Sequence, residues 1–182
     1  SNPWGLDFND YGQAFVEACV IPHLFHMIQG GRYTRQAGSH FNPYTYADIP
    51  TVADHLHYVG GSPHGGNNRS DAAGGGHDHC GTMIYLGGSW PTKYRNQMFM
   101  GNIHGNCINA DVIEPKGATY IGKAHPGFPA KADAWKNDPY GVIRKTGDEK
   151  NPKLADLLQA NDQWFMPVVQ KTGPDGCLYI LD

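Results

Sequence analysis

The sequence predicts an all-β fold, and more specifically a partial β-propeller of four-stranded blades with long glycine-rich loops and one short inserted helix. Its 182 residues include 24 glycines and 13 prolines, well above the ~12% that average usage gives these two residue types together. Apolar residues come in short runs separated by Gly, Pro, Asn and Asp, which is typical of strands joined by turns. A glycine-containing turn followed by a short apolar run also recurs, in 2–19 and again in 172–182.

Turns of this kind suit a propeller, because each blade buries its faces against its neighbours. A closed propeller of about six blades needs ~300 or more residues, since a blade takes ~40–50. We therefore expect residues 1–182 to form part of a single propeller domain that is incomplete at both ends. Its exposed blade edges should pair with the remainder of the propeller or with another chain.

The apolar runs give the candidate strands, and several successive runs lie close enough to form hairpins. They are 4–8, 13–19, 23–28, 82–86, 97–103, 107–114, 118–121 and 177–181.

Helical signals are confined to two stretches. In 151–163, Asn151 can cap a helix, Pro152 suits its first turn, and three leucines follow at helical spacing. This pattern predicts the inserted helix. A shorter helical turn is expected within 46–55, where Asp48 can act as the cap.

The segment 60–76 reads GGSPHGGNNRSDAAGGG and has almost no apolar side chains. It cannot contribute to a core, so it predicts a surface loop. A flexible linker between domains is the alternative, although linkers carry fewer Asn, His and Arg residues.

Charge and hydropathy exclude several classes of protein. The net charge of −3 and the scattered basic residues give no footprint for nucleic acid, which needs clustered Lys and Arg. No apolar run approaches the ~20 residues of a membrane-spanning helix, so no direct span is expected. The beginning of the sequence also lacks the features of a signal peptide.

Four cysteines, at positions 19, 80, 107 and 177, form no Cys-x-x-Cys pair and no Cys-x-x-Cys-His motif. This excludes a zinc ribbon, a thioredoxin-like site and covalent haem in this chain. Two disulfides or four free thiols both remain compatible with the count.

The strongest local cluster of metal-binding side chains is His77-Asp78-His79. In an extended segment the two imidazoles point to the same side, about 7 Å apart. They can coordinate one transition metal if a third ligand joins them, and His104 in the next hairpin is the natural candidate. The alternative is a glycine-rich loop that simply exposes polar residues.

Asp7, Asn9 and Asp10 offer hard oxygen ligands just before a glycine, which suits a calcium ion. The pattern is not an EF-hand, because the twelfth position counted from Asp7 is Ala18. A turn capped by the Asx side chains is the alternative.

Two further patterns concern charged and polar side chains near the first apolar runs. Arg32 and Arg35 can pair with an anionic cofactor, because a guanidinium binds a carboxylate bidentately, and surface ion pairs are the alternative. His23 and His26 flank an apolar pair and are expected to be satisfied core residues.

The run 77–109 resembles a blade of the sorbosone/glucose-dehydrogenase-like propellers, with a small-residue loop, an apolar strand, Gly-x-x-aromatic-Pro, Tyr-Arg and a second strand. Together with NPWGLDF upstream and GPDGCLY downstream, it is similar to the PVC-type membrane-bound dehydrogenases of bacteria. The matching positions are Gly81, Ile84, Tyr85, Gly88, Trp90, Pro91, Tyr94, Arg95, Phe99 and Met100.

This resemblance implies a quinoprotein-type sugar or alcohol dehydrogenase in the periplasm or another extracytoplasmic compartment. It implies pyrroloquinoline quinone (PQQ) and Ca²⁺ as cofactors, with a haem c electron acceptor outside this chain. His79 or His104 would be the general base, and His79 and Gly81 would contact the cofactor. Arg32 and Arg35 are further candidates for binding the cofactor, on the guanidinium chemistry given above.

Two alternatives stay open beside the dehydrogenase hypothesis. One is a non-catalytic propeller scaffold, or a module that binds a carbohydrate or a partner protein. The other is a His-rich metal-binding domain.

Overall fold

The structure is a computed structural model that describes residues 2–19, 24–34, 38, 40–44, 46–53, 79–103, 106–125, 156–160 and 164–182. The described residues are all-β: they form strands and one 3-10 turn at Thr92–Tyr94, with no α-helix among them. The strands are β1 (Asn2–Phe8), β2 (Ala14–Cys19), β3 (Leu24–Met27), β4 (His79–Ile84), β5 (Met98–Asn102), β6 (Cys107–Lys116), β7 (Thr119–Ala124), β8 (Asp156–Gln159), β9 (Val169–Thr172) and β10 (Leu178–Leu181).

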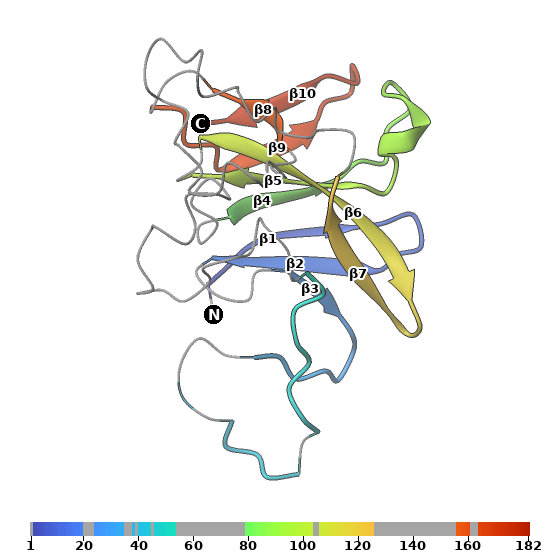
Figure 1. Ribbon diagram of the computed structural model, residues 1–182, viewed down its shortest axis with the longest axis vertical. Helices are drawn as coiled ribbons and strands as arrows, with labels where there is room; N and C mark the ends of the chain where they lie inside the picture. Colours follow the sequence, from blue (N-terminus) through green and yellow to red (C-terminus); the bar gives the residue numbers. More distant parts are fainter. Residues whose placement is uncertain are drawn as a thin grey trace, which may run out of the picture.

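The strands form three antiparallel sheets. The first is β1-β2-β3, the central sheet is β4-β5-β6-β7 with β8 also paired to β6, and the third is the hairpin β9-β10. Strands β1 and β2 contact β4, and β9 contacts β4 and β5. The central sheet therefore lies between the other two, as Figure 1 shows with the blue, green and red strands in turn.

Each face of the central sheet has its own hydrophobic core, because successive side chains of a strand point to opposite faces. Met98 and Met100 of β5 belong to the first core, which faces the first sheet, whereas Phe99 between them belongs to the second core. The other buried members of the first core are Phe15, Leu24, Val52, Ala53, Ile84 and Ile113. Those of the second core are Met83, Tyr85, Ile108 and Ala110.

A β-bulge lies in β4, where the register against β5 shifts between Cys80 and Met83. Gly81 adopts a positive φ of 63° there. A Cβ atom at this position would lie 2.5 Å from the carbonyl oxygen of Val168. Only glycine satisfies both the left-handed backbone and the close approach of the segment that leads into β9.

The β1–β2 turn is fixed to the central sheet by a bidentate ion pair. Arg95 donates from Nε and from one Nη to the two carboxylate oxygens of Asp10, each at 2.6 Å. Arg95 also donates to the carbonyl oxygen of Leu86, and Asn96 donates to Asp10. Such a fork-to-fork pair sets the orientation of both partners.

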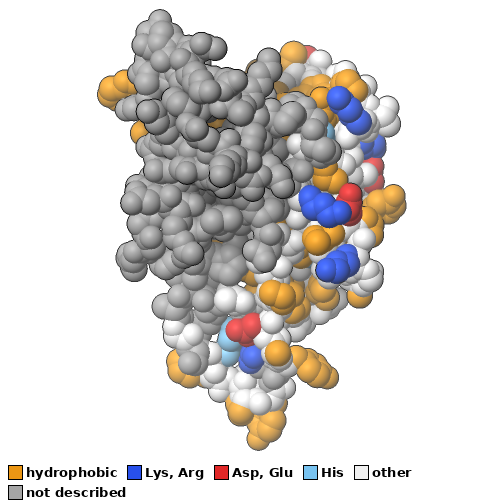
Figure 2. Space-filling model, in the orientation of Figure 1, with side chains coloured by type: hydrophobic (Ala, Val, Ile, Leu, Met, Phe, Trp, Pro, Cys, Tyr) orange, Lys and Arg blue, Asp and Glu red, His pale blue; other side chains and the backbone are white. Residues whose placement is uncertain are grey.

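Between β3 and residue 53, the described part of the chain projects away from the sheets (Figure 1). Arg32 and His40 lie 2.5 Å and 3.3 Å from the carboxylate of Asp48, and the amide of Ile49 donates to the carbonyl of Arg32. In Figure 2 hydrophobic side chains gather at this projecting end of the molecule. The aromatic residues exposed by more than nine-tenths are Phe41, Tyr44 and Tyr46.

All eight candidate strands are confirmed as strands, with boundaries shifted by a few residues at most. Strands β8 and β9 were not predicted. The loop expected at 60–76 lies outside the described residues.

The predicted helix at 151–163 is wrong where the chain is described, because 156–159 form strand β8. This strand pairs with the Cys107–Asn109 part of β6, and its two leucines pack against the second core. The helical turn expected at 46–55 is also absent from 46–53, where Ile49 and Ala53 instead make isolated parallel bridges. In both places long-range backbone pairing overrides local helical signals.

The structure also describes the state of the cysteines and the absence of a membrane-spanning helix among the described residues. All four cysteines are free thiols, and only Cys177 is exposed. Among the described residues, no helix is long and apolar enough to cross a membrane.

Candidate functional site

A row of buried polar side chains crosses one end of the central sheet. His79 of β4 pairs with Asn102 of β5, and Asn102 pairs with Cys107 of β6. Asn109 and Asp111 follow on the same face of β6, because residues two apart share a face. All five are buried, and we call them the polar row. Their face is that of the first core.

Strand alternation explains why these residues lie together. Strand β6 begins Cys-Ile-Asn-Ala-Asp, so its polar side chains face one side of the sheet and its apolar ones the other. Ile108 and Ala110 accordingly lie in the second core. The alternation places amides, a thiol and a carboxylate beside the methionines of the first core.

The two asparagines of the row are linked. Asn102 donates from Nδ2 to Oδ1 of Asn109 at 3.0 Å, and Asn109 donates to the sulfur of Cys107 at 3.5 Å. Both amides are completely buried. Burying an amide without a partner is costly, so these bonds offset the desolvation of the row.

His79 is neutral at physiological pH. Complete burial lowers the pKa of His79 to about 4, although the negative charge of Asp111 and a hydrogen bond with Asn109 partly oppose that shift. Desolvation dominates because the imidazolium loses its hydration inside the protein. His79 has no exposed surface in this structure.

Glu17 of β2 reaches the central sheet from the opposite layer. It is completely buried, and Thr82 donates to its Oε2 at 2.7 Å. Its other oxygen, Oε1, is buried and has no hydrogen-bond partner in the described part of the chain. A carboxyl group in this setting belongs with the polar row as a candidate functional side chain.

Sequence reasoning missed Glu17, Asn102, Asn109 and Asp111. The signal that was available is alternation: in β2, Glu17 occupies the same face as the core residue Phe15. A charged residue on the buried face of a strand is unusual, so this pattern identifies Glu17 as a candidate functional residue.

Two other histidines have structural surroundings. His26 contacts Gln13 Oε1 at 2.8 Å and Thr119 Oγ1 at 3.1 Å, which confirms it as a satisfied core residue. Burial lowers the pKa of His26. Burial and the charge of Lys93 lower the pKa of His125, with Asp111 acting in the opposite direction.

The predicted three-histidine metal site is only partly described, since His77 and His104 lie outside the described residues. The register of β4 and β5 places His79 opposite Asn102. Within the described ranges, no group of three or more His, Cys, Asp or Glu side chains is arranged to hold a metal ion.

The residues considered for calcium serve the protein itself. Asp7 accepts from the amide of Ile84 at 2.8 Å, and Asp10 holds Arg95. Asn9 Oδ1 accepts from the amides two and four residues further on, which confirms the Asx-capped turn at Asn9. Because protein donors already occupy these oxygens, the geometry does not support calcium there.

The described residues assigned to the quinone do not fit a common site. Arg32 is paired with Asp48 in the projecting segment, whereas His79 is completely buried in the sheet. Gly81 is covered by the carbonyl of Val168, and the Gln170 side chain donates to its carbonyl oxygen. Arg35 lies outside the described residues. The described members therefore form no cradle for PQQ.

Comparison with known proteins places the chain by family alone. No curated protein matches it, and no solved structure matches it. A family model described as "Domain of unknown function (DUF7133)" matches residues 1–182, so the chain belongs to the DUF7133 family.

Proposed function

We propose that the chain supplies consecutive blades to a β-propeller and that its described part is the scaffold of that propeller. One observation carries the proposal: three antiparallel sheets, each built from a successive stretch of chain, stack face on face. Strands β4 to β7 are neighbours in chain order, which is the up-and-down arrangement of a propeller blade.

The outer faces of the stack support the same proposal. On β1, the side chains of Leu6 and Phe8 share one face and are 52% and 47% exposed, and Trp4 at the neighbouring bulge is 49% exposed. At the opposite end of the stack, Tyr179 and Leu181 of β10 are 57% and 63% exposed. Apolar rows on both outer sheets are what a blade presents to the next blade.

Self-association of the purified chain tests the scaffold proposal. We expect the chain to associate at micromolar concentration and the variant Leu6→Lys to shift it toward the monomer in sedimentation velocity. Tyr11→Lys is the matched control, because Tyr11 is 73% exposed in a turn outside the apolar row. A chain that is monomeric without the substitution, or equal effects of both variants, contradicts the proposal.

The second candidate is a quinoprotein-type sugar or alcohol dehydrogenase, as the sequence resemblance implies. The likeness of the run 77–109 to a blade of that family supports it. In this candidate His79 is a positioning residue, and the chemistry belongs to residues outside the described part.

Dye reduction tests this candidate. Full-length protein supplied with PQQ and Ca²⁺ should reduce a redox dye in the presence of a sugar or alcohol, and His104→Ala should lower that rate by at least tenfold. If the rate of substrate oxidation is unchanged in both His77→Ala and His104→Ala, the dehydrogenase hypothesis is rejected.

A further inference from the structure

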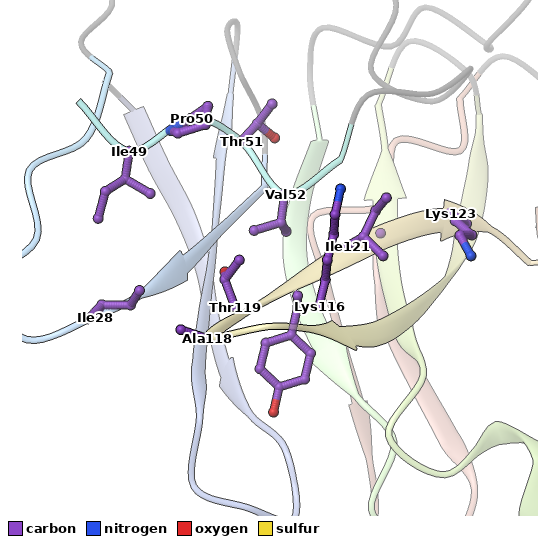
Figure 3. Close-up of a pocket in the computed structure, with 12 residues that line it drawn as sticks. Ile28, Ile49, Pro50, Thr51, Val52, Lys116, Ala118, Thr119, Ile121 and Lys123 are labelled. Carbon is purple, nitrogen blue, oxygen red and sulfur yellow. The ribbon is translucent and has the colours of Figure 1, made fainter. Parts of the chain in front are cut away.

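We propose that a groove beside β7 binds an aliphatic carboxylate. The groove has a volume of about 780 Å³, which lies within the ~300–1,000 Å³ typical of ligand sites. We call it the β7 groove, and Figure 3 shows its walls. It is lined by Ile28, Ile49, Pro50, Thr51, Val52, Lys116, Ala118, Thr119, Tyr120, Ile121, Gly122 and Lys123.

Apart from Ile28, the walls come from two segments, 49–52 and 116–123, that are fixed to each other. The amide of Gly122 in β7 donates to the carbonyl of Val52 at 2.7 Å, and Ala53 bridges Gly122. A Cβ at Gly122 would lie 3.2 Å from the Ala53 side chain, so glycine lets the segments approach closely. The groove is therefore a built feature of the fold.

The lining is aliphatic and cationic. Isoleucine, valine, proline and alanine make up half of the lining residues, and Tyr120 is the one aromatic residue among the described lining. The lining includes two lysines and no acidic residue, although the chain as a whole has a net charge of −3. An apolar wall beside a cation fits a ligand with an aliphatic body and one negative charge.

Lys116 is the group that can meet this charge. Lys123 is paired with Glu114 at 2.5 Å, whereas no ion pair or hydrogen bond holds Lys116 among the described residues. The hydroxyl of Thr51 donates to the Leu24 carbonyl, and that of Thr119 contacts His26. In Figure 3 the Lys116 side chain extends from the β6–β7 hairpin toward the segment that carries Val52.

The ammonium of Lys116 is thus free to pair with a carboxylate while the aliphatic body lies against the isoleucines. An ion pair formed over an apolar surface loses less to solvent competition than one in open water. A neutral alcohol of the same length would use the walls alone, and an alkylammonium would be repelled. Affinity should follow the order carboxylate, alcohol, ammonium.

Calorimetric titration of the full chain with octanoate, 1-octanol and octyltrimethylammonium tests this order. Lys116→Gln should weaken the binding of octanoate about fivefold and leave the affinity for 1-octanol unchanged. Lys116→Arg should retain the affinity for octanoate. Lys93→Gln is the matched control, because Lys93 is an exposed lysine outside the groove. Circular dichroism of each variant verifies that the fold is unchanged.

A second variant tests the location. Ala118 is an exposed residue of the lining, so Ala118→Phe should fill the groove and weaken the binding of both octanoate and 1-octanol. The proposal is overturned if octanoate does not saturate the chain, if octanoate and 1-octanol bind equally, or if Lys116→Gln and Lys93→Gln have the same effect.

Discussion

The two faces of the central sheet differ in chemistry although the same strands build both. The second core is apolar and aromatic: Tyr85 stacks on Trp90 at 4.3 Å, and Trp90 meets Phe99 edge-on at 5.6 Å. The first core joins its methionines to the polar row, in which His79 and Asp111 are both completely buried. One face of the sheet can therefore supply most of the stability while the other keeps polar groups that are costly to bury.

The largest effect is expected in the second core. Phe99→Ala should lower the free energy of unfolding by about 3–5 kcal/mol, because Phe99 is completely buried among aromatic rings. Urea denaturation measures the loss. Phe8→Ala is the control, since Phe8 is 47% exposed on β1. Equal losses would mean that the second core is not the main source of stability.

The polar row should make stability depend on pH. His79 has a pKa of about 4 in the folded protein and about 6.5 when unfolded. The unfolded chain therefore binds the proton first, and stability is lost as pH falls from 6.5 to 4. The loss from this residue is about 3 kcal/mol.

Denaturation of the native chain and of His79→Gln at several pH values isolates this contribution. His26 and His125 also have lowered pKa values, but they are common to both proteins and cancel in the difference. If the two proteins lose stability in parallel between pH 6.5 and 4, His79 is not buried in its neutral form.

Substitutions of the two hydrogen-bonded asparagines, Asn102 and Asn109, should have non-additive effects on the free energy of unfolding. Asn109→Ala leaves the buried Nδ2 of Asn102 without its acceptor and should cost about 1–3 kcal/mol. Replacing both Asn102 and Asn109 by Leu should cost less than the sum of the two single Leu replacements, because neither amide is then left without the other. A strictly additive double-mutant cycle would show that the two amides act independently.

Local pattern was enough to predict most strands but not their partners. The runs that became β4 and β5 are largely apolar, and the run that became β6 alternates polar and apolar residues, so all three stand out in the sequence. Strand β9 alternates Val-Gln-Lys-Thr and has too few apolar residues to be recognised. Strand β8 carries leucines that suit a helix equally well, and only its pairing with β6 makes it a strand.

The candidate site was predicted from clusters of reactive side chains, and that approach found His79 alone of the polar row. The sequence offered two settings for His79, a metal site with His77 and His104 or a glycine-rich loop that exposes polar residues. The structure buries His79 because its register places it opposite Asn102 within the sheet. Register depends on contacts between distant segments, so a pattern along the chain does not determine which polar residues converge.

The smallest effect on stability is expected at the thiols, which lie on both faces of the central sheet and at the surface of the molecule. Cys107 lies on the first face, and Cys80 lies on the second, where it donates to the Pro167 carbonyl. Both are buried with Cys19, whereas Cys177 is exposed. Cys177 alone should therefore react with a disulfide reagent in the native chain, and all four thiols should react after unfolding.

Asp175 raises the pKa of Cys177, so the reaction of Cys177 should be slow at neutral pH and accelerate in alkali. Cys177→Ser should abolish the native reaction and change stability by less than about 0.5 kcal/mol; a second reactive thiol in the native chain would show that one face opens to solvent.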